Sequence, residues 1–285
     1  MDRDRTRRLA VILGMSAVVC GCTRLPGASA RNVVIVTLDT TRADYLEAYG
    51  SARSTTPTLS RLAREGVVFE QAMTVAPLTL TAHCSLFTGL RPPDHGVRDN
   101  AAAPLAARHV TLAEVLRGRG FQTAAFTAAA VLASDRGLAR GFQVYHDGRS
   151  PDRWSPRRMR RPGSEVLDDA LAWLDTRDGS PFFLWVHLYD AHGPYTLDEP
   201  YRSLYRDDPY AGEIAFADAQ LGRLLDSLER RDLLERTAII VAGDHGESLG
   251  STASAATAWA STTVCCMFRS LPAFRALVLG VYRMW

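Results

Sequence analysis

The chain has 285 residues, 47% of them hydrophobic, which is enough for one large domain or two small ones. Its formal net charge is +2, so the sequence gives no electrostatic footprint for nucleic acid, and we expect no such partner. All 33 basic residues are arginine, which indicates a GC-rich coding sequence.

The N-terminal residues 1–22 have the layout of a bacterial lipoprotein signal peptide. Arginines precede an apolar run over 9–19, which is too short to span a bilayer. A Cys-Gly-Cys sequence follows, and we predict lipidation of Cys22 because a small residue precedes it. An ordinary cleaved signal is the alternative. With 23–31 as a linker, we expect a protein anchored by lipid to a membrane of the cell envelope, at the periplasmic face or in the outer membrane.

Apolar runs alternate with amphipathic segments along the next 220 or so residues. This alternation predicts an α/β fold with a doubly wound, mostly parallel sheet flanked by helices. Buried strands are expected at 32–38, 182–188 and 237–242, and another strand at 67–71. Helices are expected at 57–65, 111–119, 164–175 and 210–230, the stretch 123–132 is ambiguous, and 147–163 is expected to be an exposed loop.

Three of these apolar strands end in polar residues. The first strand runs into Asp39, the second into Asp190 and His192, and the third into Asp244-His245. Open α/β sheets place their sites at the carboxyl ends of strands, and carboxylate with imidazole suits a divalent metal such as zinc or manganese. For any one of these residues, a loop cap or a solvated turn is the alternative.

A polar run at 79–83 leads into an apolar turn that closes at Gly89. We predict a helix from about Thr81 to Thr88 with Thr79 at its mouth, because hydroxyl residues favour helix N-termini and glycine favours the left-handed stop. The Thr79 hydroxyl is then either a helix cap or a nucleophile, and this stretch alone leaves both readings open.

Four motifs together resemble the sulfatase branch of the alkaline phosphatase superfamily. They are VIVTLDTTRADYLEAYG (34–50), APLTLTAHCSLFTGLRPPDHGVRDN (76–100), HLYDAHGPY (187–195) and VAGDHGESLG (241–250). They stand in the order of the family and define a catalytic domain over 32–250, for which the resemblance implies an alkaline phosphatase-like fold.

The resemblance implies a metal site beside a nucleophile. By position, Asp39, Asp244 and His245 match the metal ligands of the family, and the implied cofactor is a divalent cation (Mn, Zn or Ca). Thr79 falls where the family places its nucleophile, so it would also contact the metal.

The same resemblance suggests residues that bind the substrate. His192 falls where a histidine of the family contacts the anionic oxygens of the ester, so we predict catalytic and substrate-binding roles for it. Asn100 and Arg42 are weaker candidates for substrate binding.

Two departures from the family pattern bear on the chemistry. Sulfatases proper carry Cys-x-Pro-x-Arg or its Ser variant, whose first residue becomes formylglycine, whereas residues 79–83 here read Thr-Leu-Thr-Ala-His. Cys84 stands five places late, so we interpret it as a packing residue of the helix. Thr40 replaces the second Asp of the usual Asp-Asp pair. We therefore expect a Thr79 hydroxyl activated by the metal rather than formylglycine.

The tail over 251–285 differs in character from the rest of the chain. It contains none of the 31 acidic residues and two of the five cysteines. A hydrophobic C-terminal segment is one interpretation. We prefer a frameshift after Gly250, since GC-rich codons read in another frame give Glu-His-Gly-Glu-Arg-Gly-His-Gly-Leu, which resembles the family's continuation. The C-terminal part of the domain would then be missing.

The function expected from the sequence is hydrolysis of sulfate or phosphate esters through Thr79 and one divalent metal. The substrate would be a small-molecule, glycan or lipid-headgroup ester. The rival hypothesis is an inactive truncated remnant or a non-catalytic binding protein of the envelope.

Overall fold

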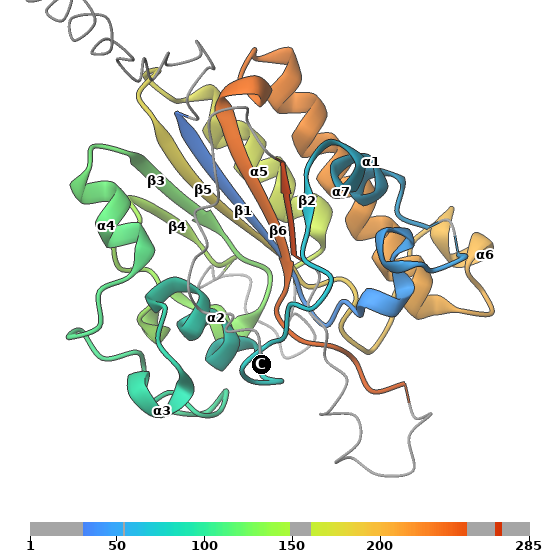
Figure 1. Cartoon of the computed structure of the whole chain (residues 1–285), viewed down its shortest axis with the longest axis horizontal. Coiled ribbons are helices and arrows are strands. Elements are labelled where there is room, and N and C mark those ends of the chain that lie inside the picture. Colours follow the sequence, from blue (N-terminus) through green and yellow to red (C-terminus); the bar gives the residue numbers. More distant parts are fainter. Residues whose placement is uncertain (1–30, 54, 149–160, 250–265, 270–285) are drawn as a thin grey trace, which may run out of the picture.

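The computed structural model describes residues 31–53, 55–148, 161–249 and 266–269. The described strands form one sheet of seven strands in the order β2-β7-β6-β1-β5-β3-β4 (Figure 1). The strands are β1 (Asn32–Leu38), β2 (Val67–Val68), β3 (Gln122–Phe126), β4 (Val144–His146), β5 (Phe182–Leu188), β6 (Thr237–Gly243) and β7 (Cys266–Arg269). From β6 to β4 all neighbours are parallel, and β7 and β2 extend the sheet with antiparallel pairing. The predicted mostly parallel α/β sheet is confirmed.

Helices cover both faces of this sheet, as a doubly wound fold requires (Figure 1). The α-helices are α1 (Pro57–Glu65), α2 (Thr79–Thr88), α3 (Pro92–His95), α4 (Leu112–Gly118), α5 (Gly163–Asp175), α6 (Tyr201–Leu204) and α7 (Pro209–Arg230). Short 3-10 helices lie at Ala43–Tyr45, Glu47–Tyr49, Ala130–Leu132, Ser134–Arg136 and Leu234–Arg236. Side chains of α1, α5 and α7 share one core cluster, and those of α2 and α4 share the other.

The alternation of side chains along β1 decides which residues face α2. Val34 and Val36 pack into the core beneath α5 and α7, whereas Ile35 packs into the core beneath α2. Because successive strand residues point to opposite faces, Thr37 and then Asp39 continue on the α2 side. The sequence of β1 therefore delivers a carboxylate to the start of α2.

Most predicted elements are found within a residue or two of their expected ends. The capping box at the start of α4 shows why one boundary was readable: the Thr111 side chain accepts the N–H of Glu114, and the Glu114 carboxylate accepts the N–H of Thr111. The ambiguous stretch resolves into β3 followed by a 3-10 helix.

Two strand predictions need correction. The strand expected over 67–71 is only two residues long, because it pairs only with two residues of the short strand β7. Beyond it Phe69 is 43% exposed, so the apolar pattern there does not mark a buried strand. The edge strand β4 was not predicted from the sequence.

Several sequence predictions fall outside the described residues. They are the signal peptide with Cys22, most of the 23–31 linker, most of the loop over 147–163 and all of the tail except β7. The frameshift and the lipid anchor stay predictions. Within the described part of the chain, no helix is both long and apolar enough to cross a bilayer.

Candidate active site

The Thr79 hydroxyl is not a helix cap. Helix α2 begins at Thr79 itself. Its N-cap residue is Leu78, whose side chain makes no capping hydrogen bond. The Thr79 Oγ1 instead lies 3.1 Å from Asp39 Oδ2 and 3.2 Å from His245 Nε2. Of the two readings left open by the sequence, the cap is wrong. The predicted stop at Gly89 is confirmed, because it lies in the left-handed region at φ 70°.

Asn100 binds the start of α2. Its Oδ1 accepts a hydrogen bond of 3.0 Å from the backbone N–H of Leu80, one of the amides that a helix N-terminus leaves without an internal partner. This contact holds Asn100 one residue from Thr79. The substrate-binding role of Asn100 stays a prediction, but its carbonyl oxygen already has a structural partner.

Asp39 uses one carboxylate oxygen for hydrogen bonds and leaves the other without any. Its Oδ2 accepts from Thr79 Oγ1 and lies 3.2 Å from His187 Nε2. The backbone N–H of Ala128 donates to His187 Nδ1 at 3.4 Å, so the proton of the neutral ring is on Nε2, which donates to Asp39. Asp39 Oδ1 is buried and has no hydrogen-bond partner among the described residues.

The two carboxylate oxygens of Asp244 differ in the same way. Its Oδ1 accepts the backbone N–H groups of Thr40 at 3.1 Å and of His245 at 2.7 Å. Thr40 reaches this position with a φ of 52°, an uncommon conformation for a residue other than glycine. The Oδ2 atom of Asp244 is buried and, within the described ranges, has no hydrogen-bond partner.

His245 completes the cluster with a lone pair. Its Nδ1 lies 3.0 Å from the carbonyl oxygen of Gly246, which can only accept, so Nδ1 carries the proton of the neutral ring. The Nε2 atom then faces Asp244 Oδ2 at 3.6 Å and Asp39 Oδ1 at 4.0 Å.

These three side chains fit a divalent cation. Asp39, Asp244 and His245 each offer one ligand atom, and these atoms lie within 4.8 Å of one another. A buried carboxylate oxygen without a partner is costly, and a divalent cation would satisfy two of them together with the imidazole lone pair. Two oxygens and one nitrogen suit zinc or manganese better than calcium, which prefers oxygen ligands alone.

Without a metal, the three side chains of the cluster have shifted pKa values. Burial raises the pKa of both Asp39 and Asp244, and the neighbouring Asp39 charge raises the pKa of Asp244 further. Burial acts to lower the pKa of His245, but the two carboxylates outweigh it, and the pKa of His245 is raised. A divalent cation would offset the repulsion between the two carboxylates.

The other predicted substrate residues lie around the cluster. His192 stacks on Tyr189, with ring centroids 4.5 Å apart. Arg42 forms an ion pair of 2.7 Å with Asp44 and donates to a backbone carbonyl of the 243–247 loop. The roles of His192 and Arg42 in substrate binding stay predictions.

Asp190 has a different task from the other strand-end carboxylates. Its Oδ1 accepts the backbone N–H of Gly163 at 2.9 Å, at the first residue of α5. A Cβ atom at Gly163 would lie 2.3 Å from Asp190 Oδ2, so a larger residue there would displace the Asp190 carboxylate. Asp190 belongs to neither group of described side chains whose ligand atoms lie close enough together to hold one cation, which agrees with leaving it out of the metal site.

Two buried histidines near the site escaped the sequence reasoning. His187 lies inside the apolar run of β5, and His83 lies inside the altered formylglycine window, so neither stood out. Burial lowers the pKa of each to about 4, so both rings are neutral near pH 7. His187 lies opposite Thr37 in the parallel pairing of β1 with β5. This position would have pointed to His187, but finding it from the sequence requires knowing that these two strands pair.

Cys84 is a packing residue, in agreement with its interpretation from the sequence. It is fully buried in the core beneath α2, and its thiol is free. Burial raises the pKa of the Cys84 thiol to about 12, so it is not a reactive thiolate near pH 7.

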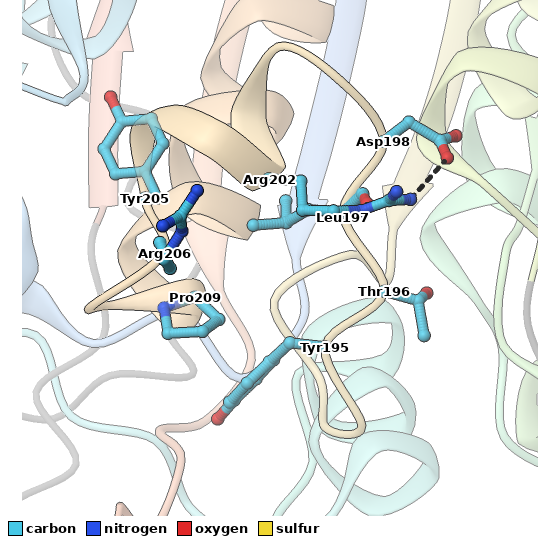
Figure 2. Close-up of a pocket in the computed structure, with 8 residues that line it drawn as sticks. All are labelled: Tyr195, Thr196, Leu197, Asp198, Arg202, Tyr205, Arg206 and Pro209. Atoms are coloured by element: carbon cyan, nitrogen blue, oxygen red, sulfur yellow. Dashed lines mark hydrogen bonds and ion pairs between the residues drawn. The ribbon is translucent and has the colours of Figure 1, made fainter.

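A separate pocket of about 540 Å³ lies in the segment that follows His192 (Figure 2). One of its arginines, Arg202, forms an ion pair of 3.7 Å with Asp198. The pocket is lined by Tyr195, Thr196, Leu197, Asp198, Arg202, Tyr205, Arg206 and Pro209. None of these residues belongs to the cluster around Thr79, so we place the chemistry at the strand ends.

The fold is alkaline phosphatase-like. The crystal structure of a phosphonate monoester hydrolase of Agrobacterium radiobacter matches with a TM-score of 0.70 and 21% sequence identity, covering 84% of this chain and 68% of that one. The sequence model of the Sulfatase family matches residues 31–271. The chain therefore belongs to the sulfatase family.

Two curated relatives show how much of a family member the chain spans. The multifunctional alkaline phosphatase superfamily protein PehA of Trinickia caryophylli is 24% identical over 328 aligned positions, covering 77% of this chain and 64% of PehA. The ulvan-active sulfatase of Formosa agariphila is 23% identical over 271 positions, covering 77% of this chain and 51% of that enzyme. The chain thus spans about half to two-thirds of the length of these relatives.

Proposed function

We propose that this protein is a metal-dependent hydrolase of sulfate or phosphate esters that uses Thr79 as its nucleophile. One observation carries the proposal: the Thr79 hydroxyl contacts Asp39 and His245 beside two buried carboxylate oxygens that have no hydrogen-bond partner among the described residues. A hydroxyl next to a cation site, with a proton acceptor in reach, is the arrangement that nucleophilic catalysis needs.

The chain supplies an acceptor for the hydroxyl proton. Asp39 Oδ2 lies 3.1 Å from Thr79 Oγ1, within hydrogen-bond distance. His245 Nε2 lies 3.2 Å from the same oxygen, but its lone pair would be used by the cation. The oxygen attacks the phosphorus or sulfur atom in line with the leaving group. A bond from Oγ1 to that atom forms, the ester bond breaks, and the leaving alkoxide takes up a proton from water. Water then cleaves the phospho- or sulfo-threonine and restores the hydroxyl.

Asp39, Asp244 and His245 would hold the cation, with Thr79 beside them. A divalent metal bound there would lower the pKa of the Thr79 hydroxyl and neutralise charge on the non-bridging oxygens of the ester. His192, which stacks on Tyr189, is proposed to bind those oxygens once the substrate is present.

Two considerations bear on the substrate class, and they favour different esters. The family and the ulvan-active sulfatase among its relatives favour a sulfate ester of a small molecule or glycan. The threonine in place of a formylglycine precursor favours a phosphate mono- or diester. Lipid-headgroup esters also fit an enzyme of the cell envelope, which is the location we propose from the N-terminal sequence.

A substrate panel on the full chain tests the proposal. An aryl sulfate, a phosphate monoester and a phosphodiester are each assayed with added Mn²⁺ or Zn²⁺, for wild type, Thr79→Ser and Thr79→Ala. We expect Thr79→Ala to lose at least about 10³-fold in kcat and Thr79→Ser to keep most activity. Equal activity of Thr79→Ala and wild type would contradict the proposal and favour a binding protein or an inactive remnant.

A further inference from the structure

Three buried side chains near the start of α2 form a chain of hydrogen bonds that ends at the backbone of Thr79. Trp185 Nε1 donates to Thr37 Oγ1 at 3.0 Å. Thr37 Oγ1 lies 3.0 Å from His83 Nε2, and His83 Nδ1 lies 2.7 Å from the backbone carbonyl oxygen of Thr79. The side chains of Trp185, Thr37 and His83 are fully buried.

The chemistry of the end groups fixes the direction of every bond in this chain. A carbonyl oxygen only accepts, so His83 Nδ1 carries the proton and donates to Thr79. In the neutral ring Nε2 then has the lone pair and accepts from the Thr37 hydroxyl. The Thr37 oxygen in turn accepts from the indole, which only donates.

This direction argues against a second metal at the same place. His83, His187 and Asp244 offer ligand atoms close enough together for a cation, with His83 Nδ1 3.7 Å from Asp244 Oδ2. With its proton on Nδ1 and its Nε2 lone pair engaged by Thr37, His83 has no lone pair left for a cation. The group of atoms is better explained as support for the active site.

We propose that His83 is a positioning residue that ties the Thr79 backbone of α2 to β1, the strand that carries Asp39. Thr37 lies two residues before Asp39 on the same face of β1, so the chain of hydrogen bonds links the nucleophile to the strand that bears its hydrogen-bond partner. The carbonyl it fixes belongs to the first residue of α2, the residue whose hydroxyl contacts Asp39 and His245. The catalytic consequence rests on the proposed function.

Two substitutions of Thr37 separate positioning from packing. Thr37→Ser keeps a hydroxyl that can donate to His83 Nε2, whereas Thr37→Val keeps the shape of the side chain and removes the hydroxyl that links His83 to β1. We expect Thr37→Val to lower kcat by about 10²-fold at unchanged KM and unchanged Mn²⁺ affinity, since a displacement of about 1 Å costs that much. Thr37→Ser should recover most of that loss.

His95, the last residue of α3, offers a matched control because it also contacts a side chain of α2. His95 is buried, and its Nε2 lies 2.9 Å from Ser85 Oγ of α2. We expect His95→Gln to lower the melting temperature without the selective loss of kcat. Equal losses in Thr37→Ser and Thr37→Val, or a loss of kcat in Thr37→Val no larger than in His95→Gln, would overturn the inference.

A spectroscopic readout keeps the test independent of turnover. In ¹⁵N-histidine-labelled full chain, the inference requires a protonated Nδ1 and an unprotonated Nε2 for His83, assigned by comparison with His83→Asn. A proton on Nε2 would overturn it whatever the activity. If Thr79→Ala retains activity, the proposed function fails. If Thr79→Ala is inactive and the two Thr37 variants behave alike, only the positioning role fails.

Discussion

Replacing Asp39 by asparagine should separate the stability of the metal-free protein from its response to metal. The asparagine side chain keeps an acceptor oxygen for Thr79 and His187 but removes one of two facing buried carboxylates. The ligand atoms of the cluster lie within 4.8 Å of one another. At an effective dielectric constant of about 20, two ionised carboxylates at that separation repel by about 3 kcal/mol. The metal-free Asp39→Asn variant should therefore unfold at the same temperature as wild type or higher.

The response to metal should go the other way. At a Mn²⁺ or Zn²⁺ concentration about 100 times Kd, binding stabilises the folded state by about 2.7 kcal/mol, which raises the Tm of a domain of this size by about 5–10 °C. Differential scanning fluorimetry of the full chain should show this rise in wild type and none in Asp39→Asn.

Asp190→Asn is the matched control, because Asp190 accepts from Gly163 and is left out of the cluster. It should keep the full metal-dependent rise. An equal rise in Asp39→Asn and wild type would refute the metal site as we describe it.

Two further predictions concern groups outside the cation site. With its thiol pKa raised to about 12, Cys84 should resist iodoacetamide at pH 8 until the chain unfolds, and peptide mass spectrometry should find it as an unmodified cysteine; formylglycine at Cys84 would contradict the reading. Asp218 accepts the backbone N–H groups of Thr58 and Leu59 at the start of α1, and burial raises its pKa from 3.8 to about 6. Protonation of Asp218 therefore stabilises the folded state. This contribution, on the order of 3 kcal/mol, is fully present below about pH 4 and is lost as pH rises through about 6. Urea unfolding of Asp218→Asn should show a flatter pH profile in that window, and an unchanged profile would contradict the assignment.

The fold was readable from the sequence because its local signals agree with one another. The runs at β1, β5 and β6 are long, apolar and rich in branched or aromatic residues, so their burial in a parallel sheet followed directly. β2 was overpredicted because apolar residues at a sheet edge need not be buried. β4 is only three residues long and largely exposed at its ends, which leaves no periodic pattern to detect.

The residues nearest to Thr79 could also be predicted from the sequence. Asp39, Asp244 and His245 follow strands whose ends must meet, and the family resemblance placed Thr79 beside them. The contacts of His83 and His187 could not be predicted, because they depend on strand register and on which face of β5 meets α2. The backbone of Thr40 is a similar case, since its positive φ and its bond to Asp244 cannot be read from residue type.

The claim that Thr79 carries the chemistry is tested most directly by trapping the covalent enzyme. The full chain with Mn²⁺ or Zn²⁺ is mixed with an excess of its best aryl ester, quenched in acid within one turnover and digested for mass spectrometry. Our account predicts one added phosphoryl or sulfuryl group on the peptide that contains residue 79, absent in Thr79→Ala. Turnover with the added group on another residue, or with Thr79→Ala as active as wild type, would contradict it.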